Sequence, residues 1–248
     1  MALREEFEQE GNWLFRWRSY LPLLIIILML FTFPSLRYPL MNPTINFVWD
    51  FVCLSVSLLG LIVRFVTVAY APRGTSGRNT QGQVALELNT TGMYSVVRHP
   101  LYLGNFLIWI GISLAFHSGW FLISSALIFW LYYERIMFAE EEFLRRKFQD
   151  TYINWSLQVP AFFPNMKAWR PPEEAMNVRA AIGSEYQGLF AIISAFTVIE
   201  IIKNSIMAGR FLLDFLWLKI FLLNLVFYLI IRMIKKNTPL LSKKQLKH

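Results

Sequence analysis

The residues of this chain whose types and spacing could do chemistry stand in two groups at the ends of long apolar segments. Arg98 and His99 precede one such segment, and three consecutive glutamates, Glu140–Glu142, follow the next one. Charge within or beside a bilayer costs free energy, so titratable side chains in these places indicate a functional site. Taken singly, Arg98 also suits a cytoplasmic anchor, and the glutamate run a solvated helix face.

Long apolar blocks set the environment in which these groups must work. The 248 residues are 56% hydrophobic, 17% aromatic and only 16% charged, which is too apolar for an ordinary soluble domain. A helix needs about 20 residues to cross a hydrocarbon core of about 30 Å. We therefore predict an all-α fold, a polytopic membrane helical bundle of about six transmembrane helices. The six blocks are Tyr20–Leu36, Phe47–Tyr70, Leu101–His117, Trp120–Phe138, Leu189–Met207 and Phe211–Ile234.

The third and fourth blocks determine where the two charged groups lie. Only Ser118 and Gly119 separate these blocks, which predicts a tight helical hairpin. From Glu140 to Ser156 the apolar residues recur with roughly helical spacing, so the fourth span should continue into an amphipathic interfacial helix. That helix would carry the three glutamates at the membrane boundary. The polar loop 71–97 is rich in glycine and is expected to be irregular, with the potential to form a lid.

Basic residues indicate the orientation of the bundle, because lysine and arginine gather in cytoplasmic loops. Arg37 and Arg210 fall in the connections on one side, whereas the N-terminus, the 71–100 loop, the 139–188 segment and the tail are all rich in basic residues. Both termini should therefore be cytoplasmic, in a membrane that we take to be a bacterial inner membrane. The formal net charge of +8 then reflects topology and anionic lipid headgroups, and nucleic-acid binding is not predicted.

Single residues exclude several chemistries. Cys53 is the only cysteine, which excludes an intrachain disulfide and a cysteine-based zinc site. The three histidines, His99, His117 and His248, fall on opposite membrane sides or in the tail, so no metal centre is predicted. None of the 12 glycines is spaced as Gly-x-Gly, so the glycine-rich turns that bind nucleotides are missing.

An ordered set of motifs between residues 60 and 164 carries a family resemblance. The motifs are Gly60-x-x-x-Arg64, Leu88-x-Thr90-Thr91-Gly92-x-Tyr94, Arg98-His99-Pro100-x-Tyr102-x-Gly104, Glu140-Glu141-x-x-Leu144, and Phe148-x-x-x-Tyr152 before Val159-Pro160 and Pro164. In these positions the chain resembles the isoprenylcysteine carboxyl methyltransferase and phospholipid methyltransferase superfamily of integral membrane enzymes. The resemblance implies methyl transfer from S-adenosylmethionine.

The resemblance also implies which residues form the site. Glu141 or Glu140 would receive the ammonium of S-adenosylmethionine, and His99 would help to hold the cofactor. Arg98 would pair with an anionic acceptor or with the cofactor carboxylate, and the sequence leaves both roles open. Arg98 and Glu141 are therefore the catalytic candidates. The expected cofactor-binding residues are Tyr94, His99, Pro100, Tyr102, Gly104, Glu140 and Glu141, of which Tyr102 and Gly104 would shape the cavity.

Three regions follow from this interpretation. Residues 1–46 would form an N-terminal arm and the first transmembrane helix, and residues 47–166 a methyltransferase-like membrane core. Residues 167–248 would form a linker, a C-terminal transmembrane hairpin and a basic tail. For this hairpin, simple packing is the favoured role, with core coverage, self-association and a lipid-facing cleft as alternatives.

The expected acceptor is a lipid or a lipidated molecule with an oxygen or nitrogen nucleophile at the cytoplasmic headgroup plane. The eukaryotic prenylcysteine enzymes carry an arginine just before Val-Pro, where this chain has Gln158, so a prenylated protein is not favoured. Gln149 is a second departure, standing where those enzymes have glycine. Two alternatives remain: a nicotinamide-dependent membrane reductase with a related helical core, and a non-enzymatic membrane scaffold or transporter component.

Overall fold

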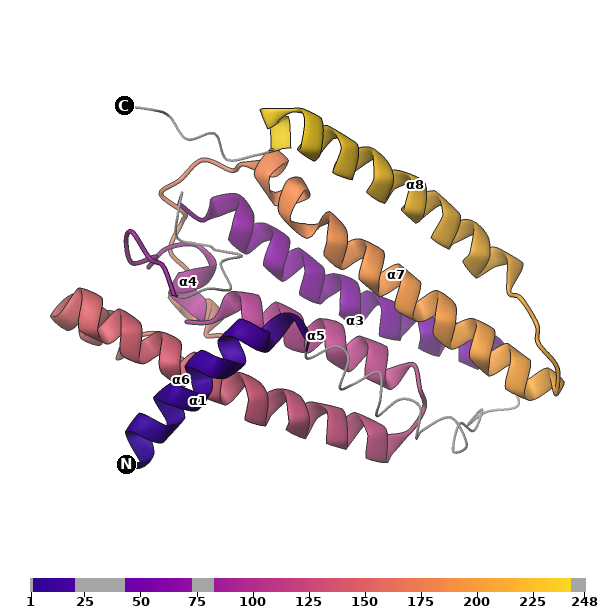
Figure 1. The fold of residues 1–248 in the computed structure, drawn as a ribbon, viewed down its shortest axis with the longest axis horizontal. Coiled ribbons are helices and arrows are strands. Elements are labelled where there is room, and N and C mark those ends of the chain that lie inside the picture. The colour runs from indigo at the N-terminus through magenta and orange to yellow at the C-terminus, as the bar shows by residue number, and fades with distance from the viewer. Residues whose placement is uncertain (1, 21–42, 73–82, 242–248) are drawn as a thin grey trace.

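The computed structural model describes residues 2–20, 43–72 and 83–241 (Figure 1). Within these ranges the chain forms helices and irregular connections and no strand, so the predicted all-α membrane bundle is confirmed. The α-helices are α1 Leu3–Trp17, α3 Pro43–Tyr70, α4 Met93–Val96, α5 Pro100–Leu114, α6 Gly119–Ser156, α7 Val178–Ala208 and α8 Phe215–Asn237. Short 3-10 turns are η1 Arg18–Tyr20, η3 Met166–Ala168 and η4 Pro239–Leu241.

Four of these helices, α3, α6, α7 and α8, are long and apolar enough to cross a membrane, and α5 is a shorter apolar helix. The expected span Tyr20–Leu36 lies outside the described residues except for its first residue. In Figure 1, α3, α7 and α8 run side by side with α8 outermost, while α5 and α6 form a hairpin beyond α3. Helix α8 begins at Phe215 rather than at the expected Phe211, because the Asp214 side chain caps its first turn.

Helix α6 continues far beyond the fourth expected span, as predicted. It runs from Gly119 to Ser156, with non-helical backbone at Gln149 (φ 45°, ψ −123°). At a rise of about 1.5 Å per residue, 38 residues exceed the thickness of the hydrocarbon core. The end of α6 that follows the glutamates therefore projects from the bundle, as Figure 1 shows.

Helix α7 begins at Val178, before the expected start of the fifth apolar block at Leu189. The side chain of Asn177 caps the helix by accepting the backbone N–H of Ala180 at 3.0 Å. The additional turns are packed against the bundle and carry Glu185, whose exposed fraction is only 4%. Apolar content alone marks the start too late, since these turns contain polar residues that the tertiary structure buries.

The N-terminal arm forms an amphipathic helix, α1, which the sequence analysis did not predict and which lies across α6 (Figure 1). Gly11 allows this crossing, because a Cβ atom there would lie 2.1 Å from the backbone oxygen of Arg135. Phe7 packs edge-on against Phe138 with ring centroids 5.8 Å apart. The guanidinium of Arg135 lies over the Phe7 ring, 3.3 Å from its centroid. Aromatic and cationic contacts thus fix α1 beside the glutamate-bearing part of α6.

Helices α3 and α5 approach each other through glycine. A Cβ atom added to Gly104 would lie 2.7 Å from the backbone oxygen of Gly60 and 2.5 Å from Cγ of Arg64. One turn after Gly104 on α5, the backbone oxygen of Ile108 accepts a hydrogen bond from the hydroxyl of Ser57 on α3 at 3.1 Å. Small residues allow such backbone contact between membrane helices, so the Gly60 and Gly104 motifs pin α5 to α3.

A buried charge cluster joins the first part of α3 to the last part of α7. Nζ of Lys203 lies 2.7 Å from Oδ1 of Asp50 and 2.6 Å from Oε1 of Glu200. The exposed fractions are 3% for Lys203, 9% for Asp50 and 5% for Glu200. Buried charges are tolerated when they are paired in this way, and the cluster fixes the register between α3 and α7.

Candidate functional site

The Arg98-His99 pair is held between α4 and α5 by the segment that follows α6. The backbone N–H of Arg98 donates to the carbonyl of Pro160 at 2.9 Å. Nearby, the N–H of Asn165 donates to the carbonyl of Val96 at 2.9 Å. His99 is the N-cap residue of α5, and Pro100 occupies the first turn, where its missing N–H costs nothing. Backbone hydrogen bonds therefore join the Arg98-His99 motif to the Val159-Pro160 motif.

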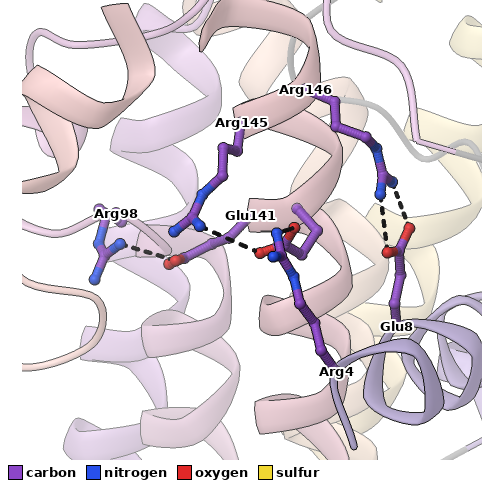
Figure 2. Close-up of polar contacts among 7 residues, drawn as sticks. Arg4, Glu8, Arg98, Glu141, Arg145 and Arg146 are labelled. Carbon is purple, nitrogen blue, oxygen red and sulfur yellow. Dashed lines mark hydrogen bonds and ion pairs between the residues drawn. The ribbon is translucent and has the colours of Figure 1, made fainter. Parts of the chain in front are cut away.

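Glu141 receives both side chains of this pair. Nη1 of Arg98 donates to Oε2 of Glu141 at 2.8 Å, as Figure 2 shows. Nε2 of His99 lies 2.9 Å from Oε1 of the same carboxylate. Nδ1 of His99 is 3.6 Å from Oε2 of Glu140, so each ring nitrogen faces a carboxylate. The structure thus brings together the two charged groups that the sequence places at the ends of separate apolar segments.

The electrostatics of His99 follow from this position. Its side chain is 5% exposed, and burial by itself lowers the pKa of an imidazole. Hydrogen bonds and charges from Glu140 and Glu141 outweigh burial and raise the pKa of His99 to about 9. His99 is therefore an imidazolium at neutral pH, with both ring nitrogens donating.

The three consecutive glutamates serve different contacts. Glu142 is paired with Arg4 of α1 and lies 3.7 Å from Nη1 of Arg145. Figure 2 shows the neighbouring pair between Arg146 of α6 and Glu8 of α1. Successive residues on a helix point about 100° apart, so Glu142 faces α1 while its two predecessors face His99. Only Glu140 and Glu141 therefore belong to the candidate site.

Aromatic rings lead from His99 into the bundle. The His99 ring stacks on Tyr102 with centroids 5.6 Å apart, and Tyr102 contacts Tyr133 at 4.9 Å. The phenol oxygen of Tyr133 accepts a hydrogen bond from Nδ2 of Asn105 at 3.1 Å. Side chains of α5 and α6 thus alternate along one continuous path.

An ion pair between Arg64 of α3 and Glu185 of α7 ends this path. Nη1 of Arg64 donates to Oδ1 of Asn105 at 2.7 Å. Nε and Nη2 of Arg64 donate to Oε2 and Oε1 of Glu185, at 2.7 and 3.0 Å. Arg64 falls within the expected span Phe47–Tyr70, where an unpaired charge is costly, and Glu185 of α7 is the partner that offsets this cost. Glu185 could have been noticed in the sequence as an acidic residue just before the fifth apolar block. It was missed because that block was taken to begin at Leu189, after Glu185.

A cavity of about 630 Å³ lies among these side chains, within the usual size range of small-molecule sites. Its polar wall includes Arg64, Arg98, His99, Asn105, Glu140 and Glu185. Aromatic side chains complete it: Phe15, Tyr94, Tyr102, Phe143, Tyr152 and Trp155. The arrangement can hold a ligand that presents an amine, a carboxylate and a flat ring.

The predicted site residues divide between this wall and the structure behind it. Tyr94, Arg98, His99, Pro100, Tyr102 and Glu140 line the cavity. Glu141 lies behind the wall and orients Arg98 and His99. Gly104 lies in the α3–α5 contact, so its role is to pack the two helices. The sequence analysis missed Phe15 and Arg18 from the N-terminal arm, and Ser184, Glu185, Gln187 and Gly188 from α7.

Comparisons with known proteins agree on the central segment. Residues 50–151 match the family model described as phospholipid methyltransferase. The chain is 32% identical over 113 residues to protein-S-isoprenylcysteine O-methyltransferase B of Arabidopsis thaliana, covering 45% of this chain and 57% of that protein. No solved structure matches the chain.

Two bacterial relatives carry names of another kind. The chain is 34% identical over 122 residues to the nickel-cobalt-cadmium resistance protein NccN of Alcaligenes xylosoxydans xylosoxydans, covering 49% of this chain and 57% of NccN. It is 32% identical over 122 residues to the cobalt-zinc-cadmium resistance protein CzcN of Cupriavidus metallidurans, covering 49% of this chain and 56% of CzcN. The chain thus spans little more than half the length of the curated relatives that it matches.

Proposed function

Because this chain belongs to the isoprenylcysteine carboxyl methyltransferase and phospholipid methyltransferase superfamily, we propose that it transfers methyl groups from S-adenosylmethionine. The acceptor is a lipid or a lipidated molecule whose oxygen or nitrogen nucleophile reaches the cytoplasmic face of the membrane. The observation that carries this proposal is the grouping of Arg98, His99 and Glu140 on one cavity wall.

The residues of this wall fit the polar end of the cofactor. Glu140 supplies a carboxylate for the ammonium group. Arg98 uses Nη1 for Glu141, and among the described residues its buried Nε has no hydrogen-bond partner. A buried donor without a partner is costly, so the guanidinium is suited to receive the carboxylate of a ligand. Between the two proposed roles of Arg98, this geometry favours cofactor binding over acceptor binding.

The apolar and aromatic wall fits the rest of the cofactor. Tyr94 and Trp155 lie on the same cavity wall, and their rings offer stacking surfaces for an adenine. Trp155 is fixed by a hydrogen bond from its Nε1 to the carbonyl of Tyr94 at 3.3 Å. The ring of Tyr102 also lines the cavity, and an aromatic ring can attract a sulfonium cation.

Methyl transfer needs little covalent help from the protein. S-adenosylmethionine would supply a methyl group on a cationic sulfur: the sulfur–carbon bond breaks, its electron pair stays on sulfur, and the acceptor–carbon bond forms. The acceptor proton passes to solvent after the transfer. The protein must hold the two reactants in line and exclude water from the reacting atoms. Glu141 and His99 act as positioning residues, because they fix the wall that holds the donor.

The membrane placement completes the proposal. Both termini and the cavity lie on the cytoplasmic side, where S-adenosylmethionine is available, and the acceptor enters from the bilayer. In this orientation the loop 83–92 and the start of α7 border the cavity at the cytoplasmic surface. The basic segments of the sequence support this orientation.

The names of NccN and CzcN favour a second candidate function, a role in resistance to divalent metal cations. In a methyltransferase, such a role would act through a methylated membrane component. In a non-enzymatic accessory protein, it would require no cofactor. A measurement of S-adenosylmethionine binding therefore distinguishes a methyltransferase with a role in metal resistance from a non-enzymatic accessory protein.

The test is calorimetric titration of the purified protein in lipid nanodiscs with S-adenosylmethionine. We expect binding, and Glu140→Gln should weaken it about tenfold, because a charge-assisted hydrogen bond is lost. Glu174→Gln, in the exposed linker before α7, is the matched control and should bind like the wild type. Absence of binding by folded wild-type protein would overturn the proposal. Transfer of hydride from reduced nicotinamide instead of tritiated methyl would establish the reductase alternative.

Lipid mass spectrometry would identify the acceptor. Membranes from cells that carry the wild-type protein should contain a species heavier by one methylene unit than its counterpart in cells that carry Glu140→Gln. Identical lipid profiles, with no labelled protein after feeding tritiated methionine, would contradict methyl transfer to a membrane component.

A further inference from the structure

We propose that the Arg64–Glu185 pair forms an acceptor subsite in the α7 part of the cavity and that it selects an amphiphile with an uncharged head group. This inference rests on the proposed function, since it concerns the acceptor of the same site. It also gives the C-terminal helices a role beyond packing, because Glu185 lies outside the segment 50–151 that matches the family model.

Polar and apolar side chains meet in the part of the cavity wall that contains the pair. Arg64, Glu185 and Asn105 all line the cavity wall, as do the apolar side chains Val68 and Ile108. Arg64 and Val68 are one turn apart on α3, so a charged and an apolar contact follow each other along the same helix. This part of the wall therefore matches a ligand with a polar head on an apolar body.

The cofactor groups identified above lie in a different part of the wall. Arg98, His99 and Glu140 come from the start of α5 and the interfacial part of α6. The pair instead comes from α3 and α7, and Asn105, Tyr133 and Tyr102 lie between it and His99. Donor and acceptor can then occupy separate parts of one cavity, as in-line transfer requires.

The hydrogen bonds within the pair determine which head group it admits. Nε and Nη2 of Arg64 are both taken by Glu185, and Nη1 donates to Asn105. Glu185 has an exposed side-chain fraction of 4% and Arg64 one of 21%, so the carboxylate is the more deeply buried partner. An anionic head group at the remaining N–H groups of Arg64 would lie beside the buried carboxylate of Glu185 and compete with it for a single positive charge, which is unfavourable.

The same reasoning excludes a cationic head group, because it would lie beside the guanidinium of Arg64 and compete with it for the carboxylate of Glu185. An uncharged hydroxyl or amide avoids both penalties, since it can use the remaining N–H groups of Arg64 while the pair stays intact. Glu185 therefore acts as a specificity-determining residue, because it neutralises the charge of Arg64 and also holds the Arg64 guanidinium in place.

A series of amphiphiles with one tail and three head groups tests this inference. Dodecanol, laurate and dodecyltrimethylammonium would be added to the purified protein in nanodiscs, and thermal unfolding would report binding. The wild type should be stabilised by dodecanol at concentrations at least tenfold lower than by either charged probe. Glu185→Gln should gain at least tenfold in apparent affinity for laurate, and Arg64→Gln a similar gain for the cationic probe.

A charge-reversed double variant separates a specificity role from damage to the fold. Arg64→Glu combined with Glu185→Arg restores a pair of opposite charges and should restore the preference for dodecanol. Glu174→Gln serves as the matched exposed control and should keep the wild-type preference. Equal responses of the wild type and Glu185→Gln to laurate would overturn the inference.

The two proposals fail in different experiments. Glu185→Gln should retain S-adenosylmethionine affinity within about threefold of the wild type, whereas Glu140→Gln should not. Loss of cofactor affinity in Glu185→Gln to the same extent as in Glu140→Gln would place the pair in the cofactor site and contradict the inference. If wild-type protein binds no S-adenosylmethionine, the proposed function fails, and the amphiphile series still decides whether the pair selects uncharged head groups.

Discussion

Oε1 of Glu141 lies 2.9 Å from Nε2 of His99, and Oε2 of the same carboxylate lies 2.8 Å from Nη1 of Arg98. One glutamate therefore orients both members of the Arg-His pair, although 42 or 43 residues separate it from them in the chain. Since Glu141 lies behind the cavity wall, its effect on ligands should be exerted through these two neighbours.

Replacing Glu141 with glutamine should weaken S-adenosylmethionine binding roughly ten- to hundredfold. The amide cannot balance the charges of Arg98 and His99, so both side chains lose their orientation. Calorimetric titration in nanodiscs measures the change. Glu142→Gln is the matched control: it removes the partner of Arg4 and should lower stability while leaving cofactor affinity close to that of the wild type. Unchanged affinity in Glu141→Gln would refute this part of the site assignment.

The stability of the fold should fall at alkaline pH because of His99. Its pKa of about 9 lies above the ordinary value of about 6.5, so its contribution is complete below pH 6.5 and is lost as the pH rises through 9. Thermal unfolding in nanodiscs between pH 6 and pH 10 tests this. The wild-type midpoint should decline by several degrees relative to that of His99→Gln, which lacks the titrating group. Parallel curves for the two proteins would contradict the assignment of the effect to His99.

Gly104→Ala should destabilise the protein by about 1–3 kcal/mol through overpacking. The new methyl group would meet the backbone oxygen of Gly60 at 2.7 Å, and a backbone atom cannot move aside cheaply. Gly119→Ala offers a comparison, because nothing lies within 4 Å of a Cβ atom at that position. Unfolding midpoints should be lower for Gly104→Ala and near the wild-type value for Gly119→Ala. A Gly104→Ala variant as stable as the wild type would show that α3 and α5 are not in backbone contact.

Cysteine labelling should place the linker before α7 in the cytoplasm and the α7–α8 connection on the opposite side. Cys53 is the only cysteine and is buried, so Cys53→Ser provides a clean background. In that background, Glu174→Cys should react with an impermeant maleimide only in inverted vesicles. Arg210→Cys should react only in right-side-out vesicles. The reverse pattern would invert the topology and place the cavity on the far side of the membrane.

Much of the fold is determined by local sequence. Apolar blocks of membrane-spanning length predict helices because backbone polar groups in lipid must be satisfied within the segment itself. The continuation of α6 beyond Phe138 follows from periodicity, and the helix does extend to Ser156, with a kink at Gln149. The Arg98-His99-Pro100 and Glu140-Glu141 motifs were recognisable for a similar reason: their members are close in sequence, and their order along the chain is visible without a fold.

Only the tertiary structure decided which of these residues act together. The glutamate run looks uniform in sequence, but successive helical residues point about 100° apart, so Glu140 lines the cavity, Glu141 holds the Arg-His pair and Glu142 faces Arg4. The ion pair of Glu185 with Arg64 likewise could not be predicted from the sequence. The pair spans 121 residues and depends on how α7 is rotated against α3, which no local pattern encodes.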